Sequence, residues 1–231
     1  MSKKTALITG SYGGLGTCLV NIHASQGGDL ILVGRSQDKL LEQAEEVKRK
    51  YNVDAQTITA DLSSPDAAQK VYDTCKENDW KVDYLINNAG FGGHGDFARG
   101  RTMEQDLSMI AVNIETPTRL CKLFLPDFIA NGEGRVLNVS STAATMPGPL
   151  QAVYFASKAF ITSDADMFPI YYSTQHRNPF LKSLQQSIFD SKGTQKHGRM
   201  QYSSAFSRVL VLYRYCVIYW FLCCAYPGAD S

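Results

Sequence analysis

Residues 5–16 read TALITGSYGGLG, a short apolar run that leads directly into a cluster of glycines. Such a run predicts a buried strand, and glycines between a strand and a helix permit a tight turn. They also let the backbone approach a pyrophosphate, which the free N–H groups at the start of a helix can bind. The stretch therefore predicts a nucleotide-binding loop. An ordinary glycine-rich turn is the alternative, because a glycine loop alone is weak evidence.

The alternation of strand and helix continues to about residue 163. Apolar runs at 30–33, 55–59, 84–87 and 135–139 are bounded by Gly, Asn, Asp or Ser and predict further buried strands. Apolar residues at helical spacing predict a helix over 36–51. These units predict an α/β fold with a Rossmann-like, doubly wound parallel sheet.

A long helical run follows Thr102, which matches a capping box with Gln105 and is expected to start a helix ending near Gly132. Pro117 and Pro126 fall inside this run. Because proline lacks the N–H that a helix interior uses, both residues are expected to kink or break it.

Length and composition limit the class of protein. The chain has 231 residues, near the upper limit for one hydrophobic core, and a formal charge of +1 that gives no argument for a nucleic-acid partner. Six cysteines are too few for a disulfide scaffold. Cys216, Cys223 and Cys224 lack the accompanying ligands of a zinc site, so no metal is expected. The N-terminal apolar run is too short for a secretory signal, which predicts a cytoplasmic protein.

The end of the second predicted strand favours a phosphorylated cofactor. Gly34 stands where an acidic residue would bind the adenosine ribose 2′-hydroxyl, and Arg35 follows it. Arginine supplies several N–H donors to phosphate. Arg35 therefore predicts NADP(H) in preference to NAD(H), with a solvated surface arginine as the alternative.

A second group of residues has the chemistry of proton transfer. Ser141 follows the fifth predicted strand, and Tyr154 and Lys158 come later, four residues apart. On a helix this spacing puts the last two side chains on one face. A nearby ammonium favours the phenolate form of a tyrosine, and Ser141 could hydrogen-bond a substrate oxygen. The alternative for a lone Tyr-x-x-x-Lys pair is an amphipathic helix surface, but the glycine loop and the serine argue against it.

Together these motifs resemble the short-chain dehydrogenase/reductase family over roughly residues 4–163, through the glycine loop, the NNAG run at 87–90, Asn113, Ser141 and the Tyr154/Lys158 pair. The resemblance implies an oxidoreductase that moves hydride between the nicotinamide of NADP(H) and a small-molecule carbonyl or secondary alcohol. Tyr154 would be the general acid and base. Lys158 would bind the nicotinamide ribose, Ser141 would polarise the carbonyl, and Asn113 would hold a water of the proton relay.

The resemblance also implies cofactor contacts at the ends of several strands, with Asp61 against the adenine ring. The expected cofactor-binding residues are Gly10, Ser11, Gly14, Leu15, Gly16, Arg35, Asp61, Leu62, Asn87, Ala89, Gly90, Tyr154 and Lys158. Dimers and tetramers are usual in the family, so a homo-oligomer is possible.

The resemblance stops near residue 163. Members of the family continue the Tyr/Lys helix and add a sixth strand that ends in a Pro-Gly turn, whereas here Pro169 is expected to stop the helix. We therefore expect a truncated NADP-binding domain at 1–163, whose last strands are missing or replaced by an atypical tail at 164–231. An altered splice or reading frame would produce such a junction, and the fifth strand would become an exposed apolar edge.

The tail leaves two alternatives open. Its apolar run at 209–225 is short for a membrane span and contains Arg214, so a buried or aberrant segment is favoured over membrane association. The loss of the substrate half would also allow a different function, a catalytically silent nucleotide-binding remnant of a reductase.

Overall fold

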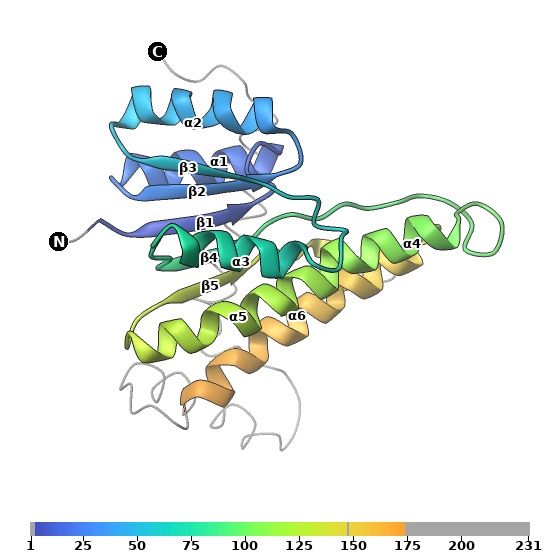
Figure 1. The fold of residues 1–231 in the computed structure, drawn as a ribbon. Helices are drawn as coiled ribbons and strands as arrows, with labels where there is room; N and C mark the ends of the chain where they lie inside the picture. Colours follow the sequence, from blue (N-terminus) through green and yellow to red (C-terminus); the bar gives the residue numbers. More distant parts are fainter. Residues whose placement is uncertain (1–2, 147, 174–231) are drawn as a thin grey trace, which may run out of the picture. The chain divides into compact units, whose positions relative to one another are not determined.

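The five predicted strands form one parallel sheet in the order β3-β2-β1-β4-β5 (Figure 1). The computed structural model describes residues 3–146 and 148–173. Its strands are β1 (Thr5–Thr9), β2 (Asp29–Gly34), β3 (Ala55–Thr59), β4 (Tyr84–Asn87) and β5 (Arg135–Asn138). The order reverses between β1 and β4, and ligands of such sheets bind outside the carboxyl ends of the strands at this switch point.

Helices connect the strands and cover the sheet. They are α1 (Gly14–Ser25), α2 (Gln37–Tyr51), α3 (Ala67–Glu77), α4 (Met103–Ile110), α5 (Thr116–Ala130) and α6 (Ala152–Ser173), with a π-helical turn η1 (Ala111–Glu115) and a 3-10 turn η2 (Thr142–Ala144). The pair α1 and α2 and the pair α3 and α5 each pack together, and right-handed crossovers put the two pairs on opposite faces (Figure 1). The predicted Rossmann-like doubly wound sheet is confirmed.

The centre of the core lies on β1 and β2. Leu7 and Ile8 are adjacent on β1 and therefore point to opposite faces, yet both are fully buried. A strand covered by helices on both faces requires such a continuous apolar run. From α2, the predicted spacing brings Leu40, Ala44 and Val47 into the cluster above β1 and β2. Each fully buried Leu or Ile contributes roughly 1.5–3 kcal/mol.

The run after Thr102 is divided by a π turn that ends at Glu115, two residues before Pro117. The predicted capping box is confirmed, since Thr102 Oγ1 accepts from Gln105 N at 3.2 Å and Thr102 N donates to Gln105 Oε1 at 3.1 Å. The turn η1 then separates α4 from α5. The break in the α-helical pattern thus falls directly before Pro117, as predicted, whereas Pro126 lies inside α5 without ending it.

The expectation that Pro169 stops the last helix is wrong, because α6 continues to Ser173. A helix can absorb a proline by local adjustment of the preceding turn. The predicted tail at 164–231 lies mostly outside the described residues, and the apolar run at 209–225 and its cysteines lie wholly outside them, so that division of the chain stays a prediction.

The described residues also bear on the sheet edge and on the membrane. Within residues 3–146 and 148–173, β5 pairs only with β4, and Leu137 of β5 is 39% exposed. None of the helices in those residues combines the length and apolar character that crossing a bilayer requires.

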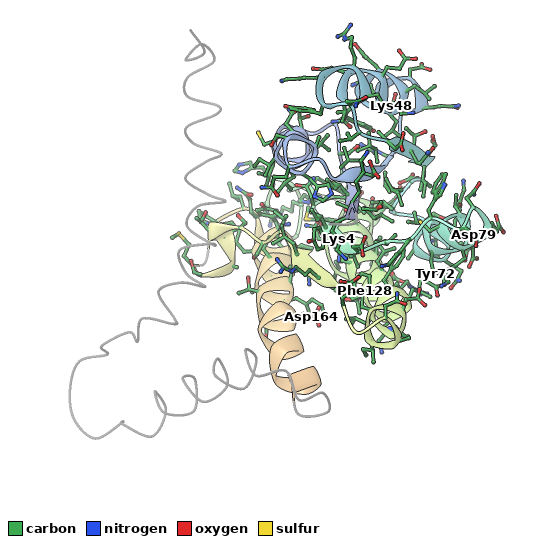
Figure 2. The ribbon with its side chains drawn as sticks, turned by 90° about the vertical axis from the view of Figure 1, so that its left-hand side faces the viewer. Lys4, Lys48, Tyr72, Asp79, Phe128 and Asp164 are labelled. Carbon is green, nitrogen blue, oxygen red and sulfur yellow. The ribbon has the colours of Figure 1, made fainter. Side chains whose placement is uncertain are left out.

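Aromatic side chains join α3 to α5. The ring of Tyr72 packs edge-on against Phe124 with 5.0 Å between centroids, and Phe124 stacks on Phe128. Figure 2 shows Tyr72 and Phe128 on these two neighbouring helices. The Tyr72 hydroxyl also donates to Asp127 Oδ2 at 3.1 Å. This packing fixes α5 and therefore the π turn that precedes it.

A cluster of charges ties together the starts of the strands. The buried Asp83 precedes β4 and accepts hydrogen bonds from Thr5 N at 3.0 Å and Lys4 Nζ at 3.2 Å (Lys4 is labelled in Figure 2). Lys81 Nζ lies 3.2 Å from the same carboxylate, and Glu133 bonds both lysines. Burial acts to raise the pKa of Asp83, but the bonds from Thr5 and the lysines outweigh it and hold the pKa below its usual value.

We predict that Asp83→Asn lowers the free energy of unfolding by about 1–3 kcal/mol at pH 7, because the amide removes the buried one of the two anions that pair with Lys4 and Lys81 and weakens the hydrogen bond from Thr5 N. A carboxylate whose folded pKa is lowered stabilises above its unfolded pKa, and that contribution is lost as the pH falls through the folded pKa. Urea unfolding should therefore show a gap from the parent protein that closes below about pH 4. The exposed Asp79 provides the control variant Asp79→Asn, and a gap that does not change with pH would contradict the assignment.

Candidate active site

Hydrogen bonds between Thr9 and Asn88 join the carboxyl ends of β1 and β4. Thr9 Oγ1 accepts from the backbone N–H groups of Asn88 and Ala89, both at 3.0 Å, and donates to Ile86 O at 3.4 Å. In return, Asn88 Nδ2 donates to Thr9 O at 2.9 Å and to Gly10 O at 3.1 Å. The loop after β4 is thus fixed against the glycine loop at the switch point of the sheet.

The glycine loop has the backbone geometry that its sequence predicts. Gly10 has a φ of +64°, and a Cβ there would lie 3.0 Å from Ala89 Cα. A Cβ on Gly16 would collide with Gly10 O, whereas a Cβ on Gly14 would meet no atom within 4 Å. Gly13 is the N-cap of α1 and provides no side-chain cap. The first N–H groups of α1 therefore face an open cradle, which fits a pyrophosphate.

The ends of β2 and β3 form the next part of the site. Arg35 is exposed and follows Gly34, and its backbone N–H donates to the Tyr12 hydroxyl at 2.9 Å. Hydrogen bonds from the backbone and side chain of Ser63 hold the pKa of Asp61 below its usual value, and the positive charge of Arg35 acts in the same direction. Arg35 and Asp61 are thus close enough for their charges to interact.

Lys158 is buried beside the loop that follows β4. Its side chain reaches across to β5, where Nζ donates to Val139 O at 3.0 Å. A Cβ on Gly90 would lie 3.0 Å from Lys158 Nζ and 3.1 Å from Asn113 Oδ1, so this glycine lets the backbone pass between the two groups. Lys158 is 6% exposed, and burial lowers its pKa to about 8.

Asn113 lies in the π turn and fixes the loop after β4 to α6. Its Nδ2 donates to Phe91 O at 3.0 Å and to Ser157 Oγ at 2.9 Å, while Oδ1 accepts from Phe91 N at 3.1 Å. Ser157 Oγ in turn donates to Tyr154 O at 2.8 Å. A π turn widens the helix by one residue and is frequent at functional sites. Here it places the amide of a buried asparagine against the helix that carries Tyr154 and Lys158.

Two serines at the end of β5 have different contacts. Ser140 Oγ donates to Lys158 O at 3.0 Å and lies 2.6 Å from Thr162 Oγ1, which ties β5 to α6. Ser141 Oγ accepts from Ala143 N at 3.2 Å and caps η2. The structure therefore places Ser141 three residues after β5, next to the residue that contacts the Tyr154/Lys158 helix.

A cavity of about 240 Å³ opens beside Tyr154. Phe97, Met109, Leu150 and Val153 give it apolar walls. Arg101 and Asp106 also line it, and they are paired through Arg101 Nε and Asp106 Oδ1 at 2.6 Å. The cavity thus has a mostly apolar lining and reaches Tyr154.

The remaining predicted residues line the same edge of the sheet. Leu62 is buried after β3, and its carbonyl accepts from Thr116 Oγ1 at 2.7 Å. Asn87 ends β4 and donates to Asn138 Oδ1 of β5 at 2.8 Å. Ser11 is buried in the glycine loop, and Leu15 lies in the first turn of α1. In residues 3–146 and 148–173, no three His, Cys, Asp or Glu side chains gather as metal ligands would.

Sequence reasoning missed three residues of the site, namely Tyr12, Ser140 and Ser157. Ser157 follows Tyr154 by three residues and therefore shares its helix face, which was an available signal. No comparable signal existed for Tyr12 or Ser140, because their contacts join segments far apart in the chain.

The chain belongs to the short chain dehydrogenase family, whose model matches residues 4–166. The very-long-chain 3-oxoacyl-CoA reductase of Rattus norvegicus is 32% identical over 161 residues, which are 68% of this chain and 50% of that protein. The chain spans about half the length of the curated relatives it matches.

Two solved structures share this fold. A short-chain dehydrogenase from Sphingobium yanoikuyae in complex with NADPH is 30% identical, with a TM-score of 0.70 over 74% of this chain and 66% of that chain. The L-sorbose reductase from Gluconobacter frateurii, complexed with NADPH and L-sorbose, is 26% identical, with a TM-score of 0.69 over 74% of this chain and 64% of that chain.

Two glycines offer a matched test of the loop. Gly14→Ala should leave the thermal melt of the nucleotide-free protein unchanged or higher, because its methyl group enters open space. The same methyl should weaken NADPH binding about tenfold or more, since it stands in front of the first N–H groups of α1. Gly16→Ala should instead lower the free energy of unfolding by about 1–3 kcal/mol through its collision with Gly10 O. If Gly14→Ala binds NADPH as the parent does, the pyrophosphate assignment is wrong.

Lys158 gives a prediction for stability against pH. With a folded pKa of about 8 against an ordinary 10.5, the buried ammonium costs stability below pH 8, and the cost disappears as the pH rises to 10.5. Between pH 8 and 10.5, the free energy of unfolding of the parent should therefore rise relative to that of Lys158→Met, by up to about 3 kcal/mol. Urea unfolding without nucleotide would measure the shift, and a difference independent of pH would show that Lys158 is not desolvated.

Proposed function

We propose that this chain is an NADP(H)-dependent oxidoreductase that interconverts a carbonyl and a secondary alcohol. The observation that carries the proposal is the convergence of Lys158 Nζ and the Asn113 amide on Gly90, at the same sheet edge as the open glycine loop. Lys158 and Asn113 can take part in proton transfer, and the glycine loop can bind a dinucleotide. The bound nicotinamide supplies or accepts the hydride, and the protein supplies position and proton transfer.

The proposed proton-transfer set is Tyr154, Lys158, Ser141 and Asn113. In the reducing direction, Tyr154 donates its phenol proton to the substrate oxygen, and in the oxidising direction it accepts one. Lys158, whose ammonium is buried on the same helix as Tyr154, would hydrogen-bond the nicotinamide ribose. Ser141 donates a hydrogen bond to the substrate oxygen, and Asn113 keeps a water next to Lys158 through which the proton is replaced.

The proposed cofactor contacts follow the sheet edge. The residues of the glycine loop would hold the pyrophosphate, Asp61 and Leu62 would contact the adenine ring, and Asn87, Ala89 and Gly90 would line the nicotinamide half. Arg35 would bind a 2′-phosphate, and no acidic side chain at position 34 opposes it. The proteins of similar fold that are complexed with NADPH support this preference over NAD(H).

The proposed substrate is a small carbonyl or alcohol with an apolar body, since the cavity beside Tyr154 has mostly apolar walls. From the sequence alone, we also propose a cytoplasmic protein without a nucleic-acid partner. A homo-oligomer is proposed on the same ground.

We predict that Tyr154→Phe lowers the turnover rate by about a hundredfold or more. NADPH binding should be kept, because the variant loses only the proton donor. NADPH oxidation would be followed with a panel of carbonyl compounds, and NADPH affinity by titration. Tyr51→Phe is the matched control, since Tyr51 lies at the end of α2 and its hydroxyl donates to Asn21 Oδ1 at 3.2 Å. Undiminished turnover in Tyr154→Phe would exclude the proposed role of Tyr154 as proton donor. If the parent protein binds NADPH but none of the carbonyl compounds leads to NADPH oxidation, the proposed oxidoreductase activity is excluded.

A further inference from the structure

We propose that Tyr12 is a specificity residue that selects a 2′-phosphorylated dinucleotide, and this inference rests on the proposed use of NADP(H). Its hydroxyl would donate a hydrogen bond to the 2′-phosphate, and its ring occupies the space that an acidic side chain at position 34 would need.

The Tyr12 hydroxyl is held at the turn between β2 and α2. It accepts hydrogen bonds from the backbone N–H groups of Arg35 at 2.9 Å and Ser36 at 3.1 Å. Two N–H donors converging on one oxygen fix the position of the phenol group although it comes from another loop, more than twenty residues earlier. The hydroxyl is therefore part of the wall of the proposed adenosine ribose site, beside Arg35.

The hydrogen of this hydroxyl is available to a ligand. A phenol oxygen can accept two hydrogen bonds and donate one. Both acceptor positions are taken by the amides, and within residues 3–146 and 148–173 the hydroxyl donates to no protein atom. Hydrogen bonds that a hydroxyl accepts polarise its O–H and make it a better donor. An oxygen that only accepts, such as that of a phosphate, is its best partner.

The charges around Tyr12 point to the same ligand. Lys39 Nζ lies 5.7 Å from the centroid of the Tyr12 ring, and the exposed Arg35 follows β2 directly. A 2′-phosphate would therefore meet a fixed O–H donor and two positive side chains. A bare 2′-hydroxyl would find no carboxylate from position 34 to accept its proton.

The same tyrosine explains why position 34 is glycine. A Cβ on Gly34 would collide with Cε1 of the Tyr12 ring, and its next distances to the ring are 3.1 and 3.2 Å. One edge of the ring therefore occupies the space beside Gly34 at the end of β2. An aspartate at position 34, which would bind the 2′-hydroxyl of NAD(H), cannot enter while Tyr12 stays in place. Tyr12 thus favours one cofactor by donation and opposes the other by exclusion.

The test compares NADPH and NADH affinity in Tyr12→Phe, in Tyr51→Phe and in the parent, by titration of each cofactor. Tyr12→Phe removes the donor and keeps the ring, so NADPH binding should weaken about tenfold, the value of one charge-assisted hydrogen bond, while NADH binding should not change. Tyr51→Phe also loses one phenol hydrogen bond, and it should leave both affinities unchanged.

A second variant keeps the test decisive if Tyr12→Phe folds poorly. Gly34→Ala retains the hydroxyl and pushes the ring off the turn, so it should show the same selective loss of NADPH affinity. Equal weakening of both cofactors, or no change in either variant, would overturn the inference and leave the proposed oxidoreductase intact. If the parent binds neither cofactor, the proposed function fails, and the inference fails with it.

Discussion

The exchange of hydrogen bonds between Thr9 and Asn88 is the constraint on which the site depends. One threonine hydroxyl serves two backbone N–H groups of the loop after β4, and one asparagine amide serves two carbonyls of the glycine loop. The glycine loop is the proposed dinucleotide cradle, and the loop after β4 contacts Lys158 and Asn113 through Gly90. Because these partly buried hydrogen bonds hold both loops in one register, the cradle and Lys158 keep a defined separation. The close approach also explains why position 10 tolerates no side chain.

Stability and function draw on different parts of the fold. The apolar runs of β1 and β2 stabilise the centre of the sheet, and the charge cluster around Asp83 stabilises the amino ends of the strands, where no ligand is expected. The carboxyl ends hold the costly features, which are a positive-φ glycine, an uncapped helix start and a desolvated ammonium. An unpaired charge of this kind persists only where the surrounding structure holds it in place. For Lys158, that structure is the packing of α6 against β5 and the contacts of Asn113.

Much of the fold could be predicted from local pattern, because a parallel sheet covered on both faces leaves a simple apolar signature. The five strands agree with their predicted positions to within a residue at each end. The rule that a proline ends a helix was less successful. Pro126 and Pro169 both lie inside helices that continue past them. The break after Ile110 is a π turn that ends just before Pro117 and that tertiary contacts of Asn113 stabilise.

The sequence by itself determined the alternation of strands and helices, the glycine loop, and the identity of the Tyr154 and Lys158 pair, since each depends on residue type and spacing along one segment. Only the tertiary structure decided how those segments meet. It joined Thr9 to Asn88, brought Ser157 and Asn113 together, and set the Tyr12 hydroxyl on the amides of Arg35 and Ser36. The physical reason is that these hydrogen bonds close loops of twenty to eighty residues, roughly, and no local pattern specifies which distant donor meets which acceptor.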